Sequence, residues 1–189
     1  MSATSYGIIV EGAYDSAVYG AIIRKLTSPN VHIRSFECGG KPKLMRTFPD
    51  FLEALKYEVA GAPVEMAIVI VDADGQDPLT VETNMRSKIA GRHYPFPLDV
   101  RFHAVHQAAD TWLLADTIAI GKIVRTKVTP SYRAPEELQH PKQEFRKLLF
   151  KYGVGSTPLV CSRIAQEIDL EKLSETCPRF RVFRELVDC

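Results

Sequence analysis

The stretch MAIVIVDADG, at residues 66–75, carries the clearest structural signal in the sequence. Residues 66–71 are all apolar and most of them are β-branched, which is typical of a buried strand. A strand that is apolar throughout suits the centre of a parallel sheet, where helices cover both faces. Asp72, Asp74 and Gly75 follow this run directly. We therefore predict a central parallel strand that ends in an acidic loop.

Further strands and helices alternate along the chain around this stretch. Strands are predicted at residues 6–10 (YGIIV), 31–36 and 100–105. Apolar residues at helical spacing predict helices at 13–26, at 44–60 with a break or new first turn at Pro49, at 81–90, and at 111–119 with Asp110 as its cap. This alternation predicts an α/β fold with a mainly parallel four-stranded sheet, right-handed crossovers and flanking helices.

The chain after residue 122 is less regular. It is interrupted by Pro130, Pro135, Pro141, Pro158 and Pro178. Helices are predicted between these prolines, at residues 142–150, 159–168 and 179–186. We expect residues 1–120 to form the α/β core. Residues 121–189 would then form a C-terminal helical extension that packs on the core and is not an independent domain.

Composition describes an ordinary globular chain and excludes several classes of protein. The 189 residues carry a net charge of +1 and are 46% hydrophobic and 25% charged, so bulk charge does not indicate nucleic acid as the partner. The four cysteines are widely spaced, which argues against a zinc site and against a disulfide framework. The N-terminal residues do not resemble a signal peptide, and no apolar run could span a bilayer. We expect a cytoplasmic protein without a membrane segment.

Acidic residues follow two of the predicted strands. Glu11 comes directly after YGIIV, and Asp72 and Asp74 come directly after MAIVIV. In parallel α/β sheets, ligands bind at the carboxyl ends of the strands. Residues two apart on an extended segment point the same way, so both aspartates are expected to project into one site with Glu11. Oxygen ligands of this kind favour Mg²⁺, with Mn²⁺ as a substitute.

Two alternatives accompany this metal site. Asp72 and Asp74 could instead cap the next helix or order its loop. Asp15 lies in the first turn of the helix after Glu11, where it is either a further acid of the site or a partner of the helix dipole. Glycines follow both acidic motifs and let the backbone approach a ligand closely.

Basic residues occur near the predicted site and along residues 122–151. Lys41 and Lys43 lie in the loop after the second strand and are candidates to bind a substrate phosphate. The later stretch contains Lys122, Arg125, Lys127, Arg133, Lys142, Arg146, Lys147 and Lys151. Both sets are interpreted either as phosphate-facing groups or as an ordinary solvated surface.

The motifs IIVEGAYDS at residues 8–16 and IVIVDADG at 68–75 resemble those of TOPRIM domains, which occur in primases, topoisomerases and related nucleases. More closely, the chain resembles a bacterial family of TOPRIM-like proteins of unknown function, numbered 4276. The segments GGKPKL (39–44), TWLLAD (111–116), HPKQEFRKLL (140–149), IDLEKL (168–173) and CPRFRVF (177–183) carry this second resemblance. The family usually has a glutamate where this chain has the shorter Asp110.

The resemblance implies a TOPRIM-like, Rossmann-like fold and a Mg²⁺-dependent nuclease or phosphotransferase that acts on nucleic acid. Glu11 would act as the general acid or base, with Asp74 as a second catalytic acid. Glu11, Asp72 and Asp74 would hold the metal, and Asp110 would be an additional acid. Association of some relatives with phage defence suggests the same setting here. The sequence contains no P-loop, so an ATP-dependent activity would need a partner ATPase.

Two other functions fit parts of the same sequence. In a phosphatase of the haloacid-dehalogenase kind, Asp72 would be a covalent nucleophile and Asp74 an acid or base. That family's motif normally lies near the start of the chain, and Glu11 would have no role. The second alternative is a non-catalytic TOPRIM-fold module that binds a partner without turnover. The near-zero net charge is compatible with it.

Overall fold

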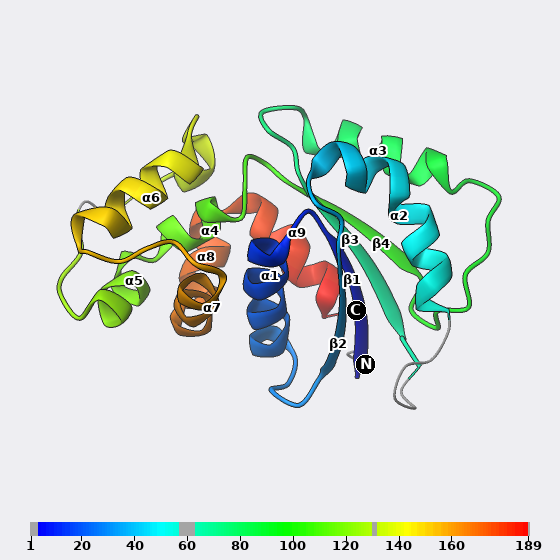
Figure 1. Ribbon diagram of the computed structural model, residues 1–189, viewed down its shortest axis with the longest axis horizontal. Helices are drawn as coiled ribbons and strands as arrows, with labels where there is room; N and C mark the ends of the chain where they lie inside the picture. Colours follow the sequence, from blue (N-terminus) through cyan, green and yellow to red (C-terminus); the bar gives the residue numbers. More distant parts are fainter. Residues whose placement is uncertain (1–3, 57–62, 130–131, 189) are drawn as a thin grey trace.

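The chain forms a four-stranded, all-parallel sheet in the order β2-β1-β3-β4 (Figure 1). The computed structural model describes residues 4–56, 63–129 and 132–188. The strands are β1 (Ser5–Val10), β2 (His32–Glu37), β3 (Met66–Asp72) and β4 (Val100–Val105). The helices that connect them are α1 (Ala13–Leu26), α2 (Lys41–Leu55) and α3 (Pro78–Lys88). The predicted α/β fold with a parallel four-stranded sheet is confirmed.

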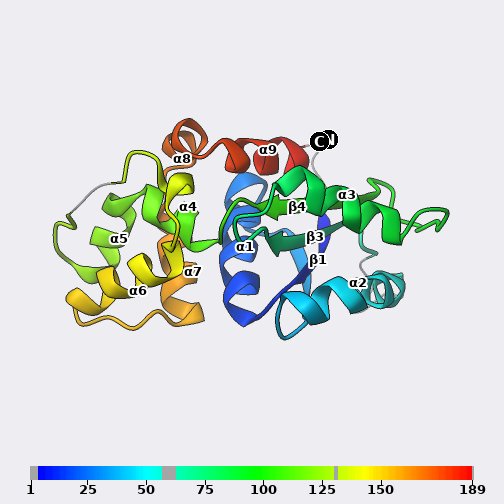
Figure 2. The ribbon, with the colours of Figure 1, turned by 90° about the horizontal axis from the view of Figure 1, so that it is seen from above.

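Helices cover both faces of the sheet (Figure 2). Helices α2 and α3 lie on one face, and α1 and α9 (Pro178–Val187) lie on the other. Along β3, Ile68 and Ile70 belong to the core beneath α1 and α9, whereas Val69 and Val71 belong to the core beneath α2 and α3. Asp72 has the same parity as Ile68 and Ile70. Its side chain is therefore directed toward the face that the C-terminal helices share.

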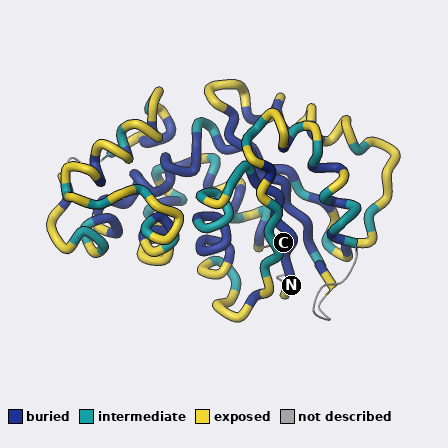
Figure 3. Tube along the Cα trace, viewed as in Figure 1, coloured by how far each residue is buried: buried dark blue, intermediate teal, exposed yellow. Residues whose placement is uncertain are grey.

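A group of helices follows β4 and packs beside α1 (Figure 1). Its members are α4 (Asp110–Ala115), α5 (Thr117–Val124), a short 3₁₀ turn (Pro135–Glu137), α6 (Pro141–Lys151), α7 (Pro158–Glu167) and α8 (Leu170–Thr176). Their inward faces are buried and their outward faces are exposed (Figure 3). Their apolar residues share one continuous core with β1 and α1. No helix within the described ranges is long and apolar enough to cross a membrane.

The predicted helix at residues 111–119 is wrong, because two helices occupy this stretch. Helix α4 ends at Ala115, and the side chain of Asp116 then accepts a 3.2 Å hydrogen bond from the backbone N–H of Ile118 at the start of α5. Asp110 is not the cap of α4 but its first residue, after Ala109. Helix α8, at residues 170–176, was not predicted; Asp169 caps it.

Pro49 does not interrupt α2, contrary to the predicted break. A proline in a helix leaves the carbonyl four residues earlier without its usual donor, which here is the carbonyl of Met45. The ammonium of Lys88, at the end of α3, donates to that carbonyl instead. Helix α2 begins at Lys41, with Pro42 in its first turn, and ends at Leu55. The later part of the predicted helix, residues 57–60, lies outside the described residues.

A buried glutamate and a partly buried arginine contact the backbone at the outer edge of β4. The Glu82 carboxylate on α3 accepts a 2.9 Å hydrogen bond from the backbone N–H of Ala104. Arg179, on α9, donates from Nε to the Ala104 carbonyl at 3.1 Å and forms an ion pair with Glu82. The N–H and the carbonyl of Ala104, on this edge strand, are thus both satisfied by side chains, one from each face of the sheet.

Candidate functional site

Two of the predicted acids meet where the central strands end. Glu11 directly follows β1, and Asp72 is the last residue of β3. The two strands are neighbours in the sheet. Glu11 Oε1 accepts a 3.0 Å hydrogen bond from the backbone N–H of Asp72. This bond fixes the Glu11 carboxylate beside Asp72, so the structure brings these two residues together.

The carboxylate of Asp72 is the most deeply buried charge of this group. Its side chain is only 4% exposed, and Lys142 Nζ on α6 lies 2.7 Å from its Oδ2 atom. The pKa of Asp72 is raised to about 7, because burial raises it most and the nearby Glu11 and Asp15 raise it as well, against a lowering by Lys142. One ammonium group therefore does not offset the burial of this carboxylate and the negative charge around it.

Asp74 lies in a turn beyond the end of β3. Its φ of 51° is in the left-handed region, so the alternation of an extended strand does not direct its side chain, contrary to the sequence argument. The side chain is 55% exposed, and its Oδ2 atom lies 3.0 Å from Lys41 Nζ at the start of α2. Burial lowers the pKa of Lys142, but the charges of Asp72, Glu11 and Asp74 outweigh burial, so the pKa is raised. Asp74 is thus the outer, solvent-facing acid of the group.

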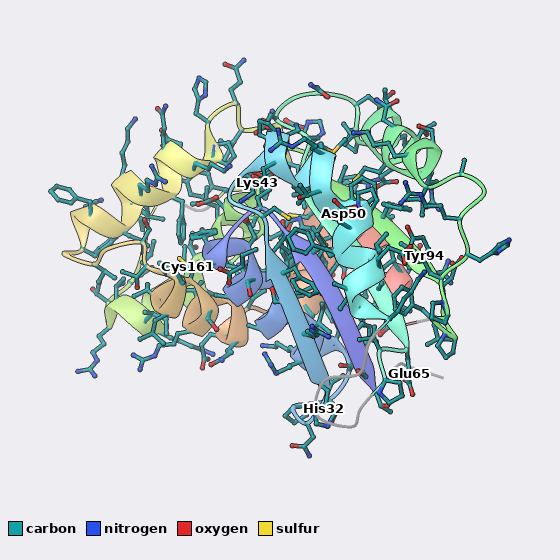
Figure 4. All side chains as sticks on the ribbon, turned by 45° about the vertical axis from the view of Figure 1, so that its right-hand side comes forward. His32, Lys43, Asp50, Glu65, Tyr94 and Cys161 are labelled. Atoms are coloured by element: carbon teal, nitrogen blue, oxygen red, sulfur yellow. The ribbon has the colours of Figure 1, made fainter. Side chains whose placement is uncertain are left out.

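The Gly39-Gly40 loop wraps around the backbone at Glu11. The N–H groups of Gly39 and Gly40 donate to the Glu11 carbonyl at 2.7 and 2.9 Å. Gly40 has φ 111° and ψ 160°, a conformation that only glycine adopts readily. Lys43 Nζ lies beside Gly39, 3.9 Å from the place that a β-carbon would occupy there. Figure 4 shows Lys43 at the opposite end of the sheet from His32 and Glu65. Lys43 therefore lies at the carboxyl end of the strands, because His32 begins β2 and Glu65 precedes β3.

Asp15 contributes both to the helix end and to the charge of the site. Its Oδ2 atom accepts a 3.0 Å hydrogen bond from the backbone N–H of Gly12, which closes the start of α1. The pKa of Asp15 is raised to about 6, chiefly by burial and also by the charge of Glu11, against a lowering by Lys142. Asp15 therefore caps the helix and at the same time adds negative charge beside Glu11.

Asp110 is held by Tyr14 and lies within the influence of the Lys142 charge. The Tyr14 hydroxyl donates a 2.8 Å hydrogen bond to Asp110 Oδ1. Burial raises the pKa of Asp110, while Tyr14, Lys142 and Arg146 lower it. Burial also raises the pKa of Tyr14, so the phenol keeps its proton and remains a donor. A tyrosine from α1 therefore fixes the position of the Asp110 carboxylate.

A family model covers almost the whole chain. It matches residues 10–188, and its description is Domain of unknown function (DUF4276). The chain belongs to this family. The matched region includes every acid and lysine described above. Searches of curated proteins and of solved structures found no match.

In this DUF4276 chain, Asp72 and Asp74 form ion pairs with lysines and do not form a preorganised metal-binding site. Within the described ranges, no group of three or more His, Cys, Asp or Glu side chains has the arrangement of a metal site. Lys142 contacts Asp72 and Lys41 contacts Asp74, so each aspartate already has one cation. The available donors are all carboxylate oxygens, the type that Mg²⁺ and Mn²⁺ prefer.

Sequence reasoning missed two contributors to this site. It placed Lys142 in a basic stretch, as a phosphate-facing or solvated residue, and did not pair it with Asp72. It gave Tyr14 no role, although Tyr14 lies in the same IIVEGAYDS motif as Glu11 and Asp15. The only signal for Tyr14 was its place in the first turn of α1, next to the acids. No local signal identified the Lys142 contact, because it depends on the packing of α6.

Proposed function

We propose that the chain is a Mg²⁺-dependent nuclease or phosphotransferase that acts on a phosphodiester of nucleic acid. The observation that carries this proposal is the buried Asp72 carboxylate, which is held against Glu11 and contacts the ammonium of Lys142. Opposite charges converge at the carboxyl ends of β1 and β3, where parallel α/β sheets bind their ligands. Such a site combines groups that attract a cation with groups that attract a phosphate.

The residues present fit a divalent metal. Glu11, Asp72 and Asp74 would hold Mg²⁺ or Mn²⁺. The fit rests on the buried Asp72 carboxylate, which is held beside the Glu11 carboxylate and has a single ammonium group, that of Lys142, 2.7 Å away. When bound, the metal would stabilise negative charge on phosphate oxygens.

The side chains of the chain itself have separate tasks in this proposal. Lys41 and Lys142 would bind phosphate oxygens, since an ammonium group is a compact phosphate ligand with several donors. Lys43, beside Gly39, would contribute at a greater distance. Glu11, oriented by the Asp72 N–H, would act as general acid or base, and the exposed Asp74 would be the second catalytic acid.

The location proposed for this activity is the cytoplasm. The described cysteines Cys38, Cys161 and Cys177 are free and buried. Reduced thiols of this kind are the usual state in a reducing compartment.

The decisive experiment combines cleavage and metal binding. Labelled single- and double-stranded DNA and RNA would be incubated with the protein and Mg²⁺, Mn²⁺ or EDTA. We expect metal-dependent cleavage, and a loss of about 100-fold or more in rate with Glu11→Gln, which removes the proton-transfer group. Calorimetry should show that Glu11→Gln largely keeps metal affinity and that Asp72→Asn loses it.

The exposed Asp50 on α2 offers a matched control (Figure 4). Asp50→Asn should cleave and bind metal as the unaltered protein does. Cleavage that Glu11→Gln and Asp72→Asn leave unchanged would refute the proposal. A phosphate trapped covalently on Asp72 would support the phosphatase instead, and a folded protein with no metal binding and no cleavage would support a binding module.

A further inference from the structure

A pocket of about 350 Å³ opens beside Asp74 and Lys142. Its walls come from the segment after β4, which contributes Gln107, and from the residues around the start of α6, which contribute Gln139, His140 and Gln143. The walls therefore join the sheet to the C-terminal helices. The site described above uses only the rim of this pocket.

The pocket is lined by hydrogen-bonding groups that the protein itself leaves unused. Gln107 is half-buried, whereas Gln139, His140 and Gln143 are exposed. Within the described part of the chain, none of these four side chains has a hydrogen bond or ion pair with another protein group. Each amide offers a carbonyl acceptor next to an NH₂ donor. The Gln107 amide nitrogen lies 3.6 Å from the place that a β-carbon on Gly75 would occupy, so the acidic loop and the pocket touch.

We propose that this pocket binds the base of one unpaired nucleotide, with its phosphate at Lys142 and Asp74. The inference rests on the proposed function, because that function places a phosphate of nucleic acid at the rim. A paired donor and acceptor on one glutamine match the hydrogen-bonding edge of a base. The His140 ring supplies a flat face on which a base can stack.

The size of the pocket favours a single nucleotide over a duplex. Its volume of about 350 Å³ is at the lower end of the range for small-molecule sites, roughly 300–1,000 Å³. A base can enter such a pocket only when it is out of a helical stack, because its edge and face are otherwise covered. The substrate class that follows is a single-stranded nucleic acid, or the frayed end of a duplex.

The test measures binding of nucleotides that contain no diester, so it does not depend on cleavage. The probes are the 5′-monophosphates of adenosine, guanosine, cytidine and uridine, compared with ribose 5-phosphate, all in the presence of Mg²⁺. Nuclear magnetic resonance of the ¹⁵N-labelled protein follows the side-chain amide signals, which Gln107→Ala and Gln143→Ala assign by removing one pair of NH₂ signals each. Gln166→Ala, at an exposed glutamine on α7, is the matched control.

At least one nucleotide should shift the signals of Gln107 and Gln143 and bind about tenfold more tightly than ribose 5-phosphate. The double variant of Gln107 and Gln143 should lose that preference and keep the affinity for ribose 5-phosphate, and Gln166→Ala should change neither. Equal affinity for nucleotides and ribose 5-phosphate, no binding of either, or full affinity in the double variant would overturn the inference. Nucleotide binding without any cleavage would refute the proposed hydrolysis alone, whereas cleavage without a base preference would refute the pocket alone.

Discussion

The buried carboxylate of Asp72 should make the fold less stable as the pH rises. Burial raises its pKa from 3.8 to about 7. A carboxyl group whose pKa is higher in the folded chain than in the unfolded chain binds more protons in the folded state. Its stabilising contribution is therefore complete below about pH 4 and is lost as the pH rises through about 7. Integration from about pH 5 to about pH 8 gives a loss of about 2–3 kcal/mol in the free energy of unfolding from Asp72.

Asp15 should add to this loss in the same direction. Burial raises its pKa from 3.8 to about 6. Over the same pH range it contributes roughly 1 kcal/mol. Asp72→Asn has nearly the same shape as the original side chain but no titrating group. It should therefore remove the contribution of Asp72 to the pH dependence and leave those of Asp15 and of the other buried acids whose pKa is raised, Asp110 and Glu136.

Urea unfolding in EDTA, at several values between about pH 5 and about pH 8, measures this dependence. Lys142→Ala should make it steeper, because the Lys142 ammonium lowers the pKa of Asp72. Asp50→Asn, at an exposed position on α2, should behave as the unaltered protein does. If the stability of Asp72→Asn falls with pH as much as that of the unaltered protein, the burial argument for Asp72 is wrong.

Two further substitutions test the elements that hold the site in place. Arg179→Ala should lower the free energy of unfolding by about 3–5 kcal/mol, because it leaves the buried Glu82 carboxylate without a cation. The exposed Arg181 on the same helix serves as control, and urea unfolding that shows equal small losses for both would contradict this reasoning. Gly40→Ala should cost about 1–3 kcal/mol because of its φ of 111°. Gly12→Ala should cost less stability in thermal unfolding, because Gly12 has an extended φ of −162° and open space around it. A larger loss of stability at position 12 than at position 40 would contradict the argument from backbone strain at Gly40.

The sheet was predictable because its signal is local. The run at residues 66–71 is apolar on both faces, and β3 is indeed covered on both by helices. The bounds of β4 and α1 also follow from local patterns. The break between α4 and α5 did not, because apolar residues continue through it and one side chain, Asp116, decides it by capping the second helix.

The site was predictable only in part, for the same physical reason. Glu11, Asp72 and Asp74 lie at strand ends, and the order of strands in a parallel sheet brings strand ends together. The orientation of Asp74 was not predictable, since it depends on a left-handed turn. The pairing of Asp72 with Lys142 was not predictable either, because it requires knowledge of how α6 packs against α4.

The parity of β3 explains why the C-terminal helices complete this site. Asp72 faces the side of the sheet that α1 and α9 cover, so its nearest cation comes from α6 and not from α2. The same arrangement places the pocket with Gln107 and Gln143 between the strand ends and α6. In the proposed activity, residues 1–120 supply the carboxylates, whereas the C-terminal segment supplies a phosphate ligand and most of the wall that would contact a base. If this proposal holds, the acidic motifs set the chemistry, and the choice of substrate depends on the helices that follow them.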